Sequence, residues 1–168
     1  MTTTNDRTVF AEGYPPAHHM LRDLNVSLEL KDTGPSIIMV PVVPAICTDR
    51  GGVQVGILAT LIDILGGAVS IRAVDPDWAA TADLNVHTMG RATSGRVSVT
   101  GSLLRAGNTM LVVELNILGE TGPPPGGWTS IGGGWISFAR LPRRDDTIQI
   151  DFHPDGANRY RFAPSGWK

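Results

Sequence analysis

One carboxylate, that of Asp63, lies within an otherwise apolar stretch over residues 56–73. Apolar residues lie almost all round this stretch at helical spacing, which predicts a buried helix. At about 100° per residue, Asp63 shares one face of that helix with small and polar residues. These residues are Gly56, Thr60, Gly67 and Ser70. A carboxylate in such surroundings can act as a general base or a nucleophile, whereas the structural alternative is an ion pair with Arg50 or Arg72.

The segment before this helix supplies candidate hydrogen-bond donors. Residues 51–56 read Gly-Gly-Val-Gln-Val-Gly. Free backbone N–H groups at a helix N-terminus can stabilise a developing oxyanion, and glycines let a ligand approach the main chain. Within the helix, Gly66 and Gly67 each cost roughly 1 kcal/mol of helix stability relative to alanine. We therefore expect a sheet or another helix to approach these glycines closely.

The elements that position these residues are strands on both sides of the helix in the sequence. Period-two alternation and β-branched residues predict strands at 26–30, 36–43, 79–89, 96–105, 110–118 and 128–141. Pro15-Pro16 predicts a short helix before the first strand. Strands that cluster after one central helix indicate an antiparallel α+β domain. We expect a single domain over residues 1–168, with its core at about 24–141, an N-terminal helical segment and a C-terminal extension.

The strand predicted at 79–89 sorts its side chains by polarity. Alternation places Thr81 on one face together with further polar residues, namely Asp83, Asn85 and His87. The other face carries Ala82, Leu84 and Val86. Thr81, near the start of the strand, is the member that we expect at a functional site.

Composition and charge argue against several classes of protein. The 168 residues carry 14 basic against 16 acidic side chains, a near-balance that argues against broad binding to nucleic acid or anionic membrane. The only cysteine, Cys47, cannot form an internal disulfide, and residues 1–12 lack the pattern of a signal peptide. No apolar run approaches the ~18 residues of a membrane span, because Asp63 interrupts the helix. We expect a cytoplasmic protein without a membrane span and, from the spacing of its histidines, without a metal site.

Two segments resemble hotdog-fold acyl-CoA thioesterases of the PaaI type, within the 4-hydroxybenzoyl-CoA thioesterase superfamily. They are residues 52–63 (GVQVGILATLID) and residues 81–86 (TADLNV). The resemblance covers about residues 24–141 and implies an antiparallel sheet wrapped around one long central helix. It also implies a homodimer, or a dimer of dimers, whose protomers pair edge to edge with the active sites at their interface.

The resemblance implies a role for each matching residue. Asp63 would attack the thioester carbonyl or activate water, while the backbone N–H of Gly56 and the side chain of Gln54 would bind the carbonyl oxygen. Thr81 of the partner subunit would orient water. The expected substrate-binding residues are Val55, Thr48, Thr60, Arg91 and Arg105, the two arginines being candidates for the phosphates of CoA, with Arg143-Arg144 as a further candidate.

The resemblance also has departures that leave three functions open. Gln54 and Val55 stand where the family usually has His and Gly, and Thr48 stands where it often has Asn. The first function is hydrolysis of an acyl-CoA thioester to a free acid and CoA, without any cofactor beyond the CoA of the substrate. The second is non-catalytic binding of acyl-CoA or lipid, and the third is a hotdog dehydratase or hydratase. The third needs an Asp/His pair, and His87 lies on a strand rather than beside Asp63.

Overall fold

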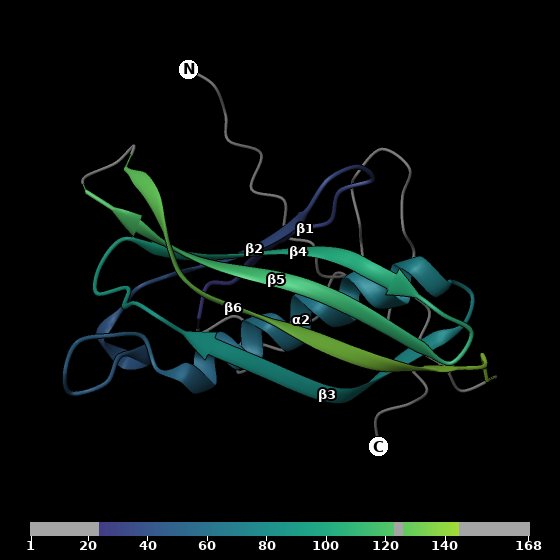
Figure 1. Cartoon of the computed structure of the whole chain (residues 1–168). Helices are drawn as coiled ribbons and strands as arrows, with labels where there is room; N and C mark the ends of the chain where they lie inside the picture. The colour runs from purple at the N-terminus through teal and green to yellow at the C-terminus, as the bar shows by residue number, and fades with distance from the viewer. Residues whose placement is uncertain (1–23, 123–125, 145–168) are drawn as a thin grey trace.

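The computed structural model describes residues 24–122 and 126–144. In these residues one long helix lies across a six-stranded antiparallel sheet (Figure 1). The elements in chain order are β1 (Ser27–Glu29), β2 (Ser36–Pro41), the 3₁₀ helix η1 (Pro44–Ile46), α2 (Val55–Val74), β3 (Trp78–Thr88), β4 (Arg96–Ala106), β5 (Met110–Thr121) and β6 (Gly127–Leu141). The six predicted strands and the central helix are confirmed, whereas η1 was not predicted. The helix expected near residues 17–21 and the extension beyond residue 144 lie outside the described residues.

The strands follow the order β1-β2-β4-β5-β6-β3, and each neighbouring pair is antiparallel. Alternate residues of the central strands face the helix and are fully buried. Examples are Val97 and Val99 on β4 and Leu111 and Val113 on β5. The two edges of the sheet differ in length, because β1 has 3 residues and β3 has 11. A long strand edge presents unpaired backbone groups that another strand can bond.

Helix α2 packs its apolar side against the inner face of this sheet. Its buried residues are Leu58, Leu61, Ile62, Leu65, Gly66, Ala68, Ser70 and Val74. The expectation of a helix buried all round is wrong on the remaining side, where Gly56 and Asp63 are exposed and Ile64 and Ile71 are half-buried. By length and composition α2 could also cross a membrane, contrary to the expectation from the sequence. Its packing in the core accounts for the same apolar composition.

The close approach expected at the helix glycines occurs at Gly66 but not at Gly67. A Cβ atom on Gly66 would lie 2.5 Å from Cγ2 of Ile136 and 3.2 Å from the ring of Phe138. A Cβ atom on Gly67 would come no closer than 3.7 Å to that ring, which is ordinary van der Waals contact. Only Gly66 is therefore required for strand β6 to cross the helix at this distance.

Strand β3 contains a β-bulge at Ala82. Thr81 pairs with Phe138 of β6 and Asp83 pairs with the adjacent Ser137, so that Ala82 has no partner in the register. Directly paired residues lie on the same face of a sheet, so Thr81 faces the helix beside the buried Phe138. Asp83 then lies on the outer face. The bulge therefore reverses the alternation within the strand.

This bulge corrects the face assignment made from the sequence. Thr81 does not share a face with the later polar residues of the strand, which are Asp83, Asn85 and His87. Beyond the bulge, Leu84 and Val86 return to the inner face and pack against the core. The extra residue lets one strand present a hydroxyl to the helix first and apolar side chains to the core afterwards.

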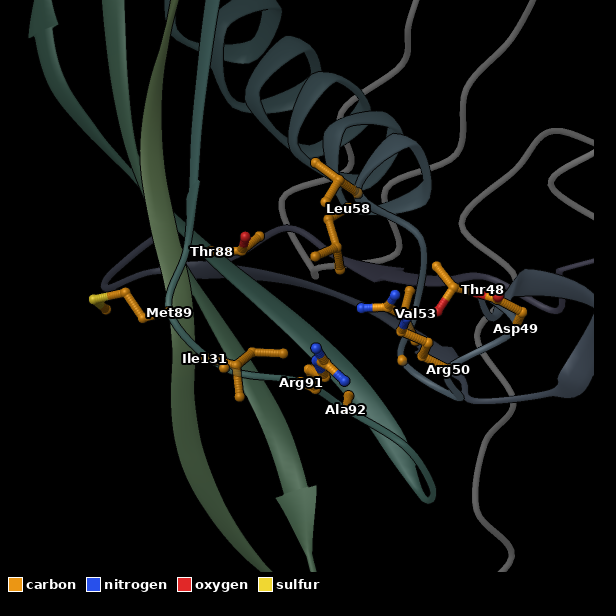
Figure 2. A pocket seen from close by; sticks show the side chains of 13 residues that line it. Thr48, Asp49, Arg50, Val53, Leu58, Thr88, Met89, Arg91, Ala92 and Ile131 are labelled. Atoms are coloured by element: carbon orange, nitrogen blue, oxygen red, sulfur yellow. The ribbon is translucent and has the colours of Figure 1, made fainter.

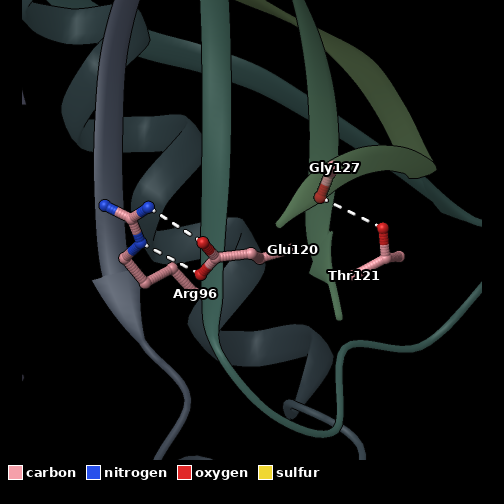
Figure 3. Close-up of polar contacts among 4 residues, drawn as sticks. All are labelled: Arg96, Glu120, Thr121 and Gly127. Carbon is pink, nitrogen blue, oxygen red and sulfur yellow. Dashed lines mark hydrogen bonds and ion pairs between the residues drawn. The ribbon is translucent and has the colours of Figure 1, made fainter. Parts of the chain in front are cut away.

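One end of the sheet is held by an ion pair between β4 and β5. The guanidinium of Arg96 donates two hydrogen bonds, of 3.0 and 2.9 Å, to the carboxylate of Glu120 (Figure 3). The Glu120 side chain is 3% exposed, and the guanidinium also lies 5.5 Å from the ring centroid of Trp128. Beyond it, the hydroxyl of Thr121 donates to the carbonyl of Gly127 and closes the β5–β6 connection.

Candidate functional site

Asp63 lies in the middle of α2 and contacts strand β3 of its own chain. The hydroxyl of Thr81 donates a 2.7 Å hydrogen bond to Oδ1 of Asp63. Both side chains are exposed, so a ligand can reach them. We expected Thr81 to come from the partner subunit, whereas the Thr81 that meets Asp63 belongs to the same chain. Among the described residues, Asp63 forms an ion pair with neither Arg50 nor Arg72, and Arg72 pairs with Asp32.

The N-terminus of α2 carries backbone donors without acceptors. Among the residues that the structure describes, the N–H groups of Val55 and Gly56 have no hydrogen-bond acceptor, and no side chain caps the helix. The first N–H bonded in this turn is that of Ile57, which donates to the carbonyl of Gln54. A Cβ atom on Gly56 would meet nothing within 4 Å. Two adjacent donors are thus free and sterically accessible.

The Gln54 side chain takes part in the loop that precedes the helix. Its Nε2 donates a 3.2 Å hydrogen bond to the carbonyl of Cys47, while its own backbone N–H donates to Ile46. An amide nitrogen has two hydrogens, so the second remains for a ligand. The interaction therefore restricts Gln54 but does not remove it from the candidate donors.

A tight loop between Cys47 and Val53 places charged side chains next to the helix N-terminus. Thr48 N–H donates to the carbonyl of Gly52, and Gly51 N–H donates to the carbonyl of Thr48. Gly51 has a φ of +82°, a conformation that side chains with a Cβ rarely adopt. Asp49 and Arg50 consequently lie at the tip of the loop.

This loop forms one wall of a cavity of about 510 Å³ (Figure 2). The opposite wall is the segment after β3, and the two walls are joined by the hydrogen bond from Val53 N–H to the carbonyl of Ala92. Arg50 and Arg91 line the cavity from the two walls, and Leu58 lines it from the helix. The cavity therefore combines cationic and apolar lining at the N-terminus of α2.

The structure brings some predicted substrate-binding residues to this cavity and leaves others away from it. Thr48, Val55 and Arg91 line it. Thr60 donates its hydroxyl to the carbonyl of Gly56 one helical turn earlier, which is a local bond within the helix. Arg105 lies near the end of β4 that leads to β5, where it pairs with Val112, and it does not line the cavity.

Several residues that line the cavity were not predicted from the sequence. They are Asp49, Arg50, Gly52, Val53, Leu58, Thr88, Met89, Gly90, Ala92 and Ile131. The Asp49-Arg50 pair ahead of two glycines is a signal that could have identified the loop. The missed residues of the opposite wall carry no such signal, because only the pairing of β3 with β6 in the sheet brings them together beside the helix.

The other polar residues do not assemble a second reactive cluster. Among residues 24–122 and 126–144, no group of three histidine, cysteine or acidic side chains is placed to hold a metal ion. His87 is on the outer face of β3, with its ring centroid 6.1 Å from that of Trp135. It therefore lies on the opposite face of the sheet from Asp63.

Comparisons with known proteins agree with this architecture. A family model described as the thioesterase superfamily matches residues 52–124. A proposed esterase from Halobacterium salinarum is 31% identical over 120 residues, which cover 68% of this chain and 79% of that protein. A proposed esterase from Saccharolobus solfataricus is 29% identical over 105 residues, covering 62% and 74%.

Solved structures show the same fold at lower identity. A mutant thioesterase from Pseudomonas aeruginosa gives a TM-score of 0.67 at 20% identity, covering 75% of this chain and 88% of that chain. A Bacillus halodurans protein solved with CoA gives a TM-score of 0.66 at 22% identity, covering 79% and 85%. The antiparallel sheet around a single long helix is thus the hotdog fold. The chain belongs to the thioesterase superfamily, and this membership supports a hydrolase of the thioesterase or esterase type.

Proposed function

We propose that the protein hydrolyses an acyl-CoA thioester to a free acid and CoA. The observation that carries the proposal is the exposed carboxylate of Asp63, held by Thr81, on a helix whose N-terminal donors are free. A carboxylate can activate water or attack a carbonyl directly, and backbone N–H groups can stabilise the oxyanion that forms. Family membership agrees with this chemistry.

The backbone N–H groups at the start of α2 and the carboxylate of Asp63 can act on the same carbonyl only if two copies of the chain meet. Gly56 and Asp63 are seven residues apart, which is about 10 Å along a helix axis. Helix N–H groups also point towards the N-terminus, away from Asp63, so a carbonyl bound there is out of reach of the same chain's carboxylate. We therefore propose a homodimer, joined along the long free edge of β3, in which Asp63 of one protomer acts on a thioester bound at the α2 N-terminus of its partner.

In this site the reaction proceeds by addition and elimination at the thioester carbonyl. The carbonyl oxygen accepts hydrogen bonds from the N–H groups of Val55 and Gly56, with Gln54 as a further donor. Asp63 removes a proton from water as the water oxygen attacks the carbonyl carbon. The tetrahedral intermediate then collapses, the C–S bond breaks, and the thiolate of CoA leaves and takes up the proton. These groups require no metal or separate cofactor.

The cavity beside the helix N-terminus is the proposed location of part of the CoA moiety. Arg50 and Arg91 supply positive charge for phosphate oxygens, and Thr48 supplies a hydroxyl. The apolar residues between them, including Val53 and Leu58, suit a less polar portion of the ligand. The relative from Bacillus halodurans was solved with CoA, which supports this choice of substrate class.

The two alternative functions make different demands on the site. A dehydratase or hydratase that uses an Asp/His pair is disfavoured, because His87 lies on the outer face of the sheet. Non-catalytic binding is favoured by the engagement of Gln54 with Cys47 and by the unusual Val55. The free N–H groups and the oriented Asp63 argue for turnover instead.

An Asp63→Asn variant tests the proposed reaction. Release of free thiol is measured with short-chain, long-chain and aromatic acyl-CoAs, and we expect kcat to fall by about 10²-fold or more. Asp83→Asn, on the outer face of the same strand as Thr81, is the matched control and should retain wild-type kcat. Turnover by Asp63→Asn at the wild-type rate would contradict the mechanism. Tight binding of acyl-CoA without turnover by the native protein would establish the binding function instead.

The assembly and location follow from the same proposal. Sedimentation equilibrium should give twice the mass of one chain, and a strictly monomeric protein would contradict the shared site. A dimer of dimers would give four times that mass and would leave the shared site intact. The free thiol of Cys47 fits a reducing compartment, so we propose the cytoplasm as the location.

A further inference from the structure

The outer face of the edge strand β3 carries a polar row that the proposed reaction does not use (Figure 1). Its members are Asp83, Asn85 and His87, and both Asp83 and His87 are exposed. Among residues 24–122 and 126–144, the carboxylate of Asp83 has no ion-pair partner, and the buried Oδ1 of Asn85 has no hydrogen-bond partner. Buried polar atoms in native proteins are normally hydrogen-bonded. The row therefore lacks partners within one chain.

The spacing of this row is self-complementary. In two identical antiparallel strands related by a two-fold axis, residues equally far before and after the axis face each other. With the axis at Asn85, the two copies of Asn85 meet, and Asp83 faces His87 of the partner subunit at both ends of the contact. A carboxylate accepts a hydrogen bond from an imidazole, which carries an N–H group whether or not it is protonated. The partner that this row fits is a second copy of the chain.

We propose that Asp83, Asn85 and His87 set the register in which β3 pairs with β3 of a second copy. This inference rests on the dimer of the proposed function and adds its register and the residues that select it. Asp83 accepts a hydrogen bond from the partner's His87, and this pair occurs twice in the dimer. Asn85 turns towards the axis, so that its Oδ1 gains a donor in Nδ2 of the partner's Asn85.

The backbone of β3 agrees with this register. The carbonyl of Asn85 lies on the side of β6, because a Cβ atom on Gly134 would collide with it. Alternate residues of a strand direct their backbone groups to opposite edges, so Leu84 and Val86 direct theirs to the free edge. In the proposed register Leu84 lies opposite the partner's Val86, and the two residues exchange both backbone hydrogen bonds. Both side chains are half-buried in one chain and cover each other in the dimer.

The same register completes the shared site. Because Ala82 is the extra residue of the bulge, Thr81 comes to lie opposite the partner's Thr88, with both side chains on the face towards the helices. Thr81 contacts Asp63, whereas Thr88 lines the cavity at the start of α2. Asp63 is thereby brought to the partner's cavity. A register shifted by two residues would displace it by about 7 Å along the strand.

Disulfide cross-linking tests the register directly. Cys47 is the only cysteine, so Asn85→Cys is made in a Cys47→Ser background. The two copies of residue 85 form a non-hydrogen-bonded pair with Cα atoms about 4.5 Å apart, which a disulfide can span. We expect a covalent dimer on mild oxidation. Asp83→Cys in the same background is the control and should not cross-link, because its two copies lie about 13 Å apart along the strands. A dimer in which Asn85→Cys fails to cross-link would overturn the inference.

Charge reversal tests the pair of Asp83 with His87. His87→Glu opposes two carboxylates at both ends of the contact, so we expect the Kd of the dimer to rise about 10-fold or more. Adding Asp83→Lys to the same chain exchanges the two charges and should return Kd to within about 3-fold of wild type. Asp83→Asn keeps an oxygen acceptor and should leave the dimer intact. Asn116→Glu, two strands away from the free edge, controls for the added charge. Fluorescence-detected sedimentation over a dilution series measures each Kd, and a double variant no tighter than His87→Glu would overturn the inference.

The failure of this inference is distinguishable from that of the proposed function. An active dimer that cross-links at another position of β3 would contradict the register alone. A dimer that cross-links through Asn85→Cys but hydrolyses no acyl-CoA would contradict the proposed function and support the register. A monomeric protein would contradict both the shared site and the register.

Discussion

Arg91 brings a positive charge to the cavity through a side chain that packs against the loop before the helix. Its aliphatic stem lies against Gly52, where a Cβ atom would be 3.4 Å from Cγ and Cδ of the arginine. The loop glycine therefore leaves room for the side chain to line the cavity. From the sequence, Arg91 was a candidate for the phosphates of CoA, and that role stays a prediction; the structure places it in the cavity wall that faces Arg50, which was missed as a lining residue.

Replacement of Arg91 by methionine should weaken binding of the CoA moiety without altering the reacting groups. We expect KM for an acyl-CoA to rise about 3- to 10-fold, because one charge-assisted contact to phosphate is lost at an exposed site. The matching acyl N-acetylcysteamine thioester lacks phosphates, so its KM should not change. Lys31→Met, on the connection between β1 and β2, controls for the loss of one positive charge. An equal rise in KM for both thioesters would contradict the assignment.

For helix α2, the spacing of apolar residues predicted the helix itself but not which of its glycines the sheet would contact. The apolar run and its two glycines predicted a helix closely approached by another element, and β6 does approach it. The sequence could not separate the two glycines, because their difference depends on where Ile136 crosses the helix. The same limit applied to β3, whose alternation was interpreted without the bulge at Ala82.

Alanine at each of the two glycines should have opposite effects on stability. Gly66→Ala places a methyl group against Ile136 and should lower the free energy of unfolding by about 1–3 kcal/mol, as overpacked cores do. Gly67→Ala meets only ordinary contact and should raise it by up to about 1 kcal/mol through helix propensity. Urea unfolding followed by circular dichroism measures both. Equal effects at the two positions would contradict the packing described for β6.

The ion pair that joins β4 to β5 should make the stability of the sheet depend on pH. The hydrogen bonds from Arg96 hold the pKa of Glu120 below its ordinary value of 4.5, against the opposing effect of burial. A lowered pKa in the folded state means that the unfolded chain binds the proton more readily. The pair therefore stabilises the fold at pH values above the pKa that Glu120 has in the unfolded chain. That contribution is lost as the pH falls through the pKa of Glu120 in the folded state.

Acid unfolding with and without this carboxylate checks the prediction. Between neutral pH and pH values below 4.5, the wild type should lose more of its free energy of unfolding than Glu120→Gln, which cannot ionise. Glu120→Gln should also be less stable at neutral pH, since Arg96 loses its charged partner. Glu114→Gln, at an exposed position of the same strand, is the control and should keep the wild-type pH dependence. Identical pH dependence in Glu120→Gln and wild type would contradict a role for the pair.

The sequence by itself determined the order of elements and the location of the candidate carboxylate, Asp63, on the central helix. Hydrophobic periodicity is a local property, so the helix around Asp63 and the strands that follow it could be inferred from neighbouring residues. Tertiary structure decided which Thr81 meets Asp63 and which residues face it across the cavity. These contacts join segments far apart in the chain, and a single unpaired residue, Ala82, reverses which side chains face the helix. A register shift of that kind depends on the partner strand, and therefore leaves no signal in the sequence of the strand alone.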